Sequence, residues 1–202
     1  MEQDRATPIF LTVPGLNNSG PDHWQSLWEQ RIPGTRRVEQ TDWEQPRRDQ
    51  WVSTVQASIP DAGGPVILIA HSLGCIAVAS WAAAQSYGQS YGRPVAGALL
   101  VAPPAIDRAG AHPLLRQFAP LPSRPLPFPS ILVASRNDQY ATLEQSLRMA
   151  RIWQSHFVDI GYRGHINAAS GLGIGGERPR LLDQVVDAAR RRQDMSRRAQ
   201  AA

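Results

Sequence analysis

Residues 65–84 read PVILIAHSLGCIAVASWAAA, and they are the most informative part of the chain. Its first residues are apolar, which is typical of a buried strand, and the segment 73–86 favours a helix. Ser72 lies between them in the pattern A-x-S-x-G, which is G-x-S-x-G with alanine in place of the first glycine. The stretch therefore predicts strand, sharp turn and helix, with the hydroxyl of Ser72 exposed at a helix N-terminus where developing negative charge is stabilised.

A plainer interpretation of Ser72 is a helix N-cap, whose hydroxyl would accept a hydrogen bond from the following backbone. The pentapeptide alone leaves both interpretations open, because a motif is a hypothesis until its structural context is known. The residues that follow other predicted strands favour the catalytic one.

Length and composition predict a single domain. A chain of 202 residues, 42% hydrophobic and 19% charged, can bury a three-layer core. No apolar stretch approaches the ~20 residues that span a bilayer, and the first residues show no secretory signal. The single cysteine, Cys75, excludes an internal disulfide and fits a reducing compartment. We expect a cytoplasmic protein without membrane contact.

The net charge of +4 is concentrated near the C-terminus. We expect one domain over residues 1–188 and a basic, flexible tail over 189–202. The chain has neither zinc-ligand cysteine spacing nor a nucleic-acid recognition motif, so no nucleic-acid partner is expected. The five histidines show no i, i+4 pairing. We therefore expect neither a metal nor a cofactor.

Apolar runs recur between helical stretches, and this alternation predicts a parallel sheet covered on both faces. The predicted strands are 8–13, 36–40, 65–70, 95–101, 130–134 and 156–160. The predicted helices are 22–31, 46–58, 73–86, 142–153 and 180–192. The proline-rich stretch 119–129 is either a stiff crossover into the next strand, which we favour, or a docking ligand. No insertion is long enough for a lid domain, so we expect an open site.

Three polar residues each follow a separate predicted strand: Ser72, Asp138 and His165. Loops at the carboxyl ends of strands in an open α/β sheet meet at one crevice. A serine hydroxyl needs a histidine to remove its proton, and an aspartate fixes the tautomer of that histidine. The order Ser, Asp, His is the order of α/β-hydrolases. The sequence therefore predicts a catalytic triad.

Other roles remain for these residues. Asp138 would also serve as a turn residue or as the cap of a helix starting near 142, and His165 as an ordinary loop histidine. Asp107 follows strand 95–101 and is a rival acid, whereas Asp159 lies inside a predicted strand. His71 is adjacent to the serine and cannot be its base, so we expect packing or a supporting hydrogen bond.

The oxyanion hole needs two donors. We expect one from the backbone N–H of Leu73, the residue after the nucleophile, and the second from Leu16 or Asn17 in the loop after the first strand. His23 and Trp24 open the next helix, and both are candidates for lining the site.

These motifs resemble a family of small, lid-less bacterial serine hydrolases related to retinoblastoma-binding protein nine. The resemblance covers residues 8–186. Its marks are Pro14-Gly15-Leu16, Asn18-Ser19-Gly20-Pro21, His23-Trp24-Gln25, Gln40 with Asp42-Trp43, His71-Ser72-Leu73-Gly74, Val101-Ala102-Pro103, Asp138 with Tyr140, and Gly164-His165-Ile166-Asn167 with Ser170-Gly171-Leu172-Gly173.

The resemblance implies an α/β-hydrolase sheet in the order 2-1-3-4-5-6, the triad named above and hydrolysis of small acyl esters or related bonds. The animal protein is named for a binding segment L-x-C-x-E, but the corresponding residues 73–77 end in alanine, so no retinoblastoma-type partner is expected. We expect a serine hydrolase acting on small acyl esters. The alternatives are a thioesterase or amidase with the same triad, a binding module with little turnover, and cofactor-free carbon–carbon or peroxide chemistry on this fold.

Overall fold

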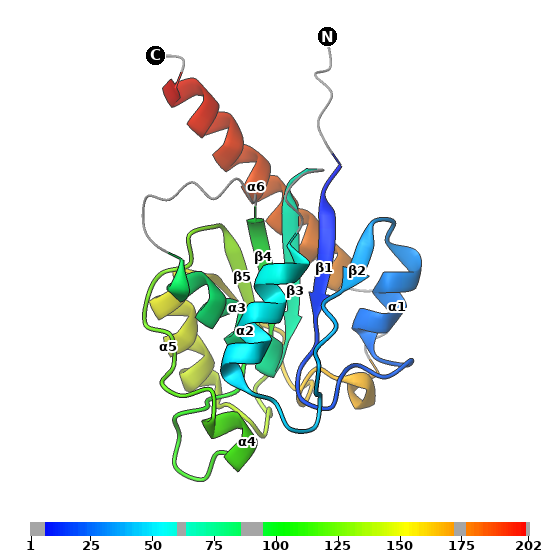
Figure 1. Ribbon diagram of the computed structural model, residues 1–202, viewed down its shortest axis with the longest axis vertical. Helices are drawn as coiled ribbons and strands as arrows, with labels where there is room; N and C mark the ends of the chain where they lie inside the picture. Colours follow the sequence, from blue (N-terminus) through cyan, green and yellow to red (C-terminus); the bar gives the residue numbers. More distant parts are fainter. Residues whose placement is uncertain (1–6, 60–63, 86–94, 172–176, 201–202) are drawn as a thin grey trace.

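A computed structural model describes residues 7–59, 64–85, 95–171 and 177–200. Its centre is a six-stranded sheet in which every neighbouring pair of strands is parallel (Figure 1). The strand order is β2-β1-β3-β4-β5-β6, as the resemblance implies. The strands are β1 (Ile9–Val13), β2 (Thr35–Arg37), β3 (Val66–His71), β4 (Val95–Val101), β5 (Ser130–Ala134) and β6 (His156–Asp159).

Helices cover both faces of the sheet, and the alternation of side chains along the strands divides the core between them. Leu68 and Leu100 belong to a cluster with α2, α3 and α5. Ile69 and Leu99 point to the other face, into a cluster with α1 and α6. The helices are α1 (Trp24–Arg31), α2 (Arg48–Ser58), α3 (Leu73–Ala84), α4 (Pro113–Arg116), α5 (Leu143–Trp153) and α6 (Glu177–Gln200), and a short 3-10 turn spans Ala168–Ser170.

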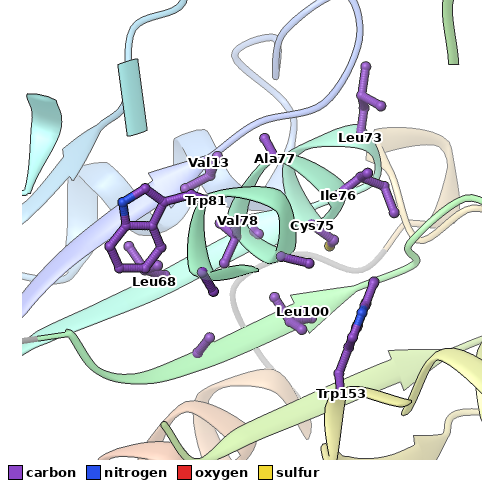
Figure 2. Close-up of a cluster of buried hydrophobic side chains, with 14 of the residues drawn as sticks. Val13, Leu68, Leu73, Cys75, Ile76, Ala77, Val78, Trp81, Leu100 and Trp153 are labelled. Carbon is purple, nitrogen blue, oxygen red and sulfur yellow. The ribbon is translucent and has the colours of Figure 1, made fainter. Parts of the chain in front are cut away.

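Helix α3 is buried almost all round, which explains its apolar composition. Figure 2 shows its side chains between neighbouring elements, with Cys75 and Val78 on the side of the helix that faces Leu100 of β4. A helix so enclosed has little freedom to shift, so the N-cap residue that precedes it is held in a defined place. That residue is Ser72.

The predicted strands and helices are confirmed in order and type, with differences at their ends. Strand β2 ends at Arg37, short of the predicted 36–40. The four-residue helix α4 was not predicted. The proline-rich stretch is a crossover fixed against α5, since Trp153 donates to the carbonyl oxygen of Pro122 at 2.9 Å. The end of the predicted helix 73–86, and Leu172 and Gly173 of the last motif, lie outside the described residues.

The expected boundary at residue 189 is a further difference, because α6 continues without interruption to Gln200. Residues 189–200 contain neither glycine nor proline and are rich in alanine, arginine and glutamine, which favour a helix. A high density of charge does not by itself end a helix of this composition. None of the described helices has the length and apolarity needed to span a membrane.

Candidate active site

Ser72 adopts a backbone conformation that residues with side chains rarely occupy, with φ +53° and ψ −126°. Its N–H donates to the carbonyl oxygen of Val101 at 2.9 Å. It stands at the N-cap position of α3, but its hydroxyl makes no capping bond to that helix, which the structure describes in full. The N-cap interpretation of the hydroxyl is therefore wrong, and the strained turn points it elsewhere.

Two glycines allow the loop after β1 to approach this turn closely. A Cβ on Gly74 would lie 2.1 Å from the carbonyl oxygen of Val13. A Cβ on Gly15 would lie 2.7 Å from the Cβ of Ser72 and 3.2 Å from the backbone nitrogen of Leu73. Both glycines of the elbow region are thus required by contact between backbones.

The structure brings Ser72, Asp138 and His165 together. The Nε2 atom of His165 lies 2.8 Å from Ser72 Oγ, and its Nδ1 atom lies 3.0 and 2.9 Å from the two carboxylate oxygens of Asp138. The side chains of His165 and Asp138 are only 8% and 3% exposed. Since a carboxylate only accepts, Nδ1 carries the proton and Nε2 is left to accept from the serine hydroxyl.

The loops that carry Asp138 and His165 are joined to each other. Asn137 Oδ1 accepts from the backbone N–H of Gly164 at 2.8 Å, and the hydroxyl of Ser135 accepts from the N–H of Arg163 at 2.8 Å. Ser135 in turn donates to Asn137 Oδ1. Asp138 and His165 are therefore positioned as one unit, although 27 residues separate them.

Two aromatic side chains support the backbone around His165. His71 Nε2 lies 3.0 Å from the carbonyl oxygen of His165, so it carries the proton and donates, which is the supporting bond expected of His71. Trp24 Nε1 donates to the carbonyl oxygen of Ile166 at 2.8 Å. The expected lining role of Trp24 is corrected: it is fully buried, and its ring packs in the α1–α6 core.

The rival carboxylates take other roles. Asp159 pairs with Arg136 at 2.7 Å, and the guanidinium holds the pKa of that carboxyl below its usual range. Asp107 is exposed. The cap of α5 is Thr142, not Asp138. Asp138 also makes the turn expected of it, since its Oδ1 accepts from the N–H of Tyr140 at 2.9 Å.

The loop after β1 forms a turn, closed by the N–H of Asn18 donating to the carbonyl oxygen of Gly15 at 3.1 Å. The N–H of Asn17 is already donated to the carbonyl oxygen of Trp43 at 2.9 Å. The expectation that the backbone N–H of Asn17 donates to an oxyanion is therefore corrected. Leu16 lines the pocket beside Ser72, and Leu73 begins α3, where backbone N–H groups have no partner within the helix.

A pocket of about 320 Å³ opens at Ser72 and His165. Its lining residues are Leu16, Asn17, Asn18, His23, His71, Ser72, His112, Leu115, Tyr140, His165 and Asn167. His23 lines it as expected. His112 was not anticipated, because it comes from the unpredicted α4, although the following Pro113 is a helix-start signal. In the described chain, no group of three His, Cys, Asp or Glu is arranged to hold a metal ion.

Comparisons with known proteins identify the family and the fold. The chain matches the model of the serine hydrolase family over residues 10–184. It is 32% identical to a YdeN-like hydrolase from Pectobacterium atrosepticum, with a TM-score of 0.77 over 91% of this chain and 92% of the other. The chain belongs to the serine hydrolase family and has the α/β-hydrolase fold.

More distant structures share the fold alone. The ydeN gene product of B. subtilis is 18% identical, with a TM-score of 0.64 over 90% of this chain and 98% of that one. Est1E from Butyrivibrio proteoclasticus, solved with ferulic acid, is 14% identical, with a TM-score of 0.59 over 82% and 84% of the two chains. A search of curated proteins gave no match.

Proposed function

We propose that this protein hydrolyses small acyl esters through an acyl-enzyme on Ser72. The observation that carries the proposal is the orientation of the serine hydroxyl. It makes no hydrogen bond to the backbone of α3 and lies 2.8 Å from Nε2 of His165. Two hydrogen bonds to Asp138 fix the imidazole in the tautomer that accepts. The arrangement is that of an activated nucleophile with an oriented base.

The steps follow from these contacts. Ser72 Oγ attacks the ester carbonyl while its proton passes to His165 Nε2, and Asp138 stabilises the imidazolium that forms. The tetrahedral intermediate collapses, and the C–O bond to the alcohol breaks as the imidazolium returns the proton to the leaving oxygen. Water then attacks the acyl group with His165 as base, and Ser72 is released with the carboxylic acid.

The negative charge that develops on the carbonyl oxygen needs preorganised donors. We assign these to the backbone N–H groups of Leu73 and Leu16. The close approach of Gly15 to Leu73 supports the assignment, because it brings the turn and the helix N-terminus side by side. Removal of one such donor typically costs about 3–4 kcal/mol of transition-state stabilisation.

The pocket favours a small acyl group. Its volume is about 320 Å³, and Leu16 and Leu115 are the aliphatic side chains among its lining residues, the others being mainly histidine and asparagine. A long alkyl chain would find little apolar surface to bury there, and burial contributes about 0.8 kcal/mol per methylene only when the wall is apolar. We expect acetyl and butyryl esters to be preferred over long-chain esters.

The test is labelling of the folded protein with a fluorophosphonate, beside the variants Ser72→Ala and Ser80→Ala. Ser80 is a matched control, because it is a buried serine of the same helix α3. We expect wild type and Ser80→Ala to label and to hydrolyse 4-nitrophenyl acetate, and Ser72→Ala to do neither. The measurement is probe incorporation per molecule by mass spectrometry.

Unchanged turnover in pure Ser72→Ala would contradict the mechanism. A folded wild type that neither labels nor turns over would favour a binding module instead. If labelling is specific to Ser72, matched acetyl ester, thioester and anilide substrates then separate an esterase from a thioesterase or an amidase.

A further inference from the structure

Arg37, the last residue of the edge strand β2, reaches the loop that follows β1. Its Nη1 donates to Asn18 Oδ1 at 3.1 Å and to the carbonyl oxygen of Ser19 at 3.0 Å. Its Nη2 donates to Ser26 Oγ at 2.6 Å and to Glu29 Oε2 at 2.8 Å, and its Nε also faces Glu29. Each of the five N–H groups of the guanidinium has an acceptor.

The pair of Arg37 and Glu29 is well shielded, with side chains 16% and 19% exposed. Glu29 also accepts from the hydroxyl of Thr12 in β1. A bidentate guanidinium–carboxylate pair has a fixed geometry that a lysine ammonium does not reproduce. Arg37 is thus a rigid link between β2, α1 and the loop.

The loop needs such a link, because Asn17 and Asn18 have φ values of +64° and +62°. Residues with side chains occupy this left-handed region at a cost, and surrounding contacts must hold them there. One end of the turn, Gly15, is packed against the elbow, and the other end is held by Arg37. Leu16 lies between these two fixed ends.

We propose that Arg37 is a positioning residue for the oxyanion hole, holding the turn so that the N–H of Leu16 faces the carbonyl oxygen of the bound ester. The proposal rests on the proposed hydrolase function. Arg37 is not among the residues that line the pocket, so it acts through the turn and does not touch the substrate. An oxyanion donor acts in the transition state, so its displacement lowers kcat and leaves KM nearly unchanged.

The experiment compares Arg37→Lys with Arg36→Lys, a neighbour on the same strand whose side chain is exposed. Hydrolysis of 4-nitrophenyl acetate is measured as kcat per active serine, counted by end-point fluorophosphonate labelling. Since complete loss of an oxyanion donor lowers kcat by about 10²–10³-fold, we expect Arg37→Lys to lower it by about tenfold or more, with KM within about threefold. Arg36→Lys should match wild type.

A second measurement separates positioning from folding. A trifluoromethyl ketone forms a tetrahedral adduct whose oxygen occupies the oxyanion hole, so its inhibition constant should weaken by about the factor lost in kcat. Ser26→Ala, which removes one contact of Arg37 and one donor to Ser19, should give a smaller loss of the same kind, and it decides the matter if Arg37→Lys does not fold.

Wild-type kcat per labelled serine in Arg37→Lys would overturn the proposal, as would wild-type kcat in Ser26→Ala when Arg37→Lys is unfolded. A rise in KM with kcat intact would overturn it too, because that pattern indicates lost ground-state binding. These results leave the proposed function standing. That function fails separately, if the wild type itself neither labels nor hydrolyses the ester.

Discussion

Among the glycines of the described residues whose surroundings are known, Gly74 is the one at which an added Cβ would make the shortest contact. A Cβ on Gly74 would lie only 2.1 Å from the carbonyl oxygen of Val13 and 2.6 Å from the carbonyl oxygen of Pro14. Both belong to the chain that leads from β1 into the turn of Leu16. A methyl group at Gly74 must therefore push this turn away from the elbow.

We expect Gly74→Ala to lower both stability and activity. Overpacking a tight core costs about 1–3 kcal/mol, and the displaced turn would also lose its donor. Thermal unfolding and kcat on 4-nitrophenyl acetate are the measurements. Gly20→Ala is the control, because nothing lies within 4 Å of its added Cβ. Equal effects of the two substitutions would contradict the steric argument.

Cys75 gives a prediction for alkaline pH. Burial raises the pKa of its thiol well above the ordinary value, so the folded protein keeps the proton where the unfolded chain loses it. Above about pH 8.5 the unfolded state therefore binds fewer protons, and its stabilisation lowers the free energy of unfolding by about 1.4 kcal/mol per pH unit.

The check is urea unfolding of wild type and Cys75→Ala between pH 8 and 10. Loss of the Sγ contact with the carbonyl oxygen of Val101 shifts the variant by a constant, whereas the thiol changes the slope. We expect the wild-type curve to fall more steeply above about pH 8.5. Parallel curves would mean that the thiol ionises within the fold.

At the residue scale, the sequence predicted the three residues of the candidate triad but, apart from His71, not the residues that hold them in place. Ser72, Asp138 and His165 follow predicted strands, so parallel topology alone places them together. Arg37 carries no such signal, because its role depends on the reach of a side chain across two elements. The roles expected of Asn17 and Trp24 were wrong for the same reason. Their hydrogen-bond partners, Trp43 and Ile166, are distant from them in sequence.

At the scale of elements, α6 divides into a packed half and an exposed half. Leu181, Leu182, Val185 and Val186 are buried in the core cluster shared with α1. From Arg190 onward the described side chains are exposed or half-buried. Helix propensity extends α6 past its last buried turn. The cluster of basic residues that begins at Arg190 therefore does not coincide with the end of the helix.

We expect truncation after Arg192 to change the free energy of unfolding by less than about 1 kcal/mol, because the removed part buries little. Leu182→Ala should cost about 2–5 kcal/mol, as a large-to-small change in a packed core. Urea denaturation of both proteins is the measurement. A truncation as costly as Leu182→Ala would show that the exposed half contributes to stability.

At the scale of the whole molecule, strand count, strand order and the edge that carries the site were all predictable. Buried parallel strands give strong apolar signals, and the marks of the resemblance supply the order. The short edge strand β2 and helix α4 were predicted poorly or not at all, because three- and four-residue elements contain too little periodicity. The polarity of the pocket could not be predicted from the sequence either, because the residues that line the pocket come from loops that follow several different strands.

The distribution of Ser72, Asp138 and His165 along the chain has a consequence in time. Ser72 lies in the first half of the sequence, and its hydrogen-bond partner His165 comes 93 residues later. Synthesis runs from the N-terminus at about 5–20 residues per second, so Ser72 leaves the ribosome several seconds before His165. Under the proposed mechanism, a nascent chain carries an inert alcohol through that interval, and nucleophilic reactivity arises only when β6 docks at the edge of the sheet.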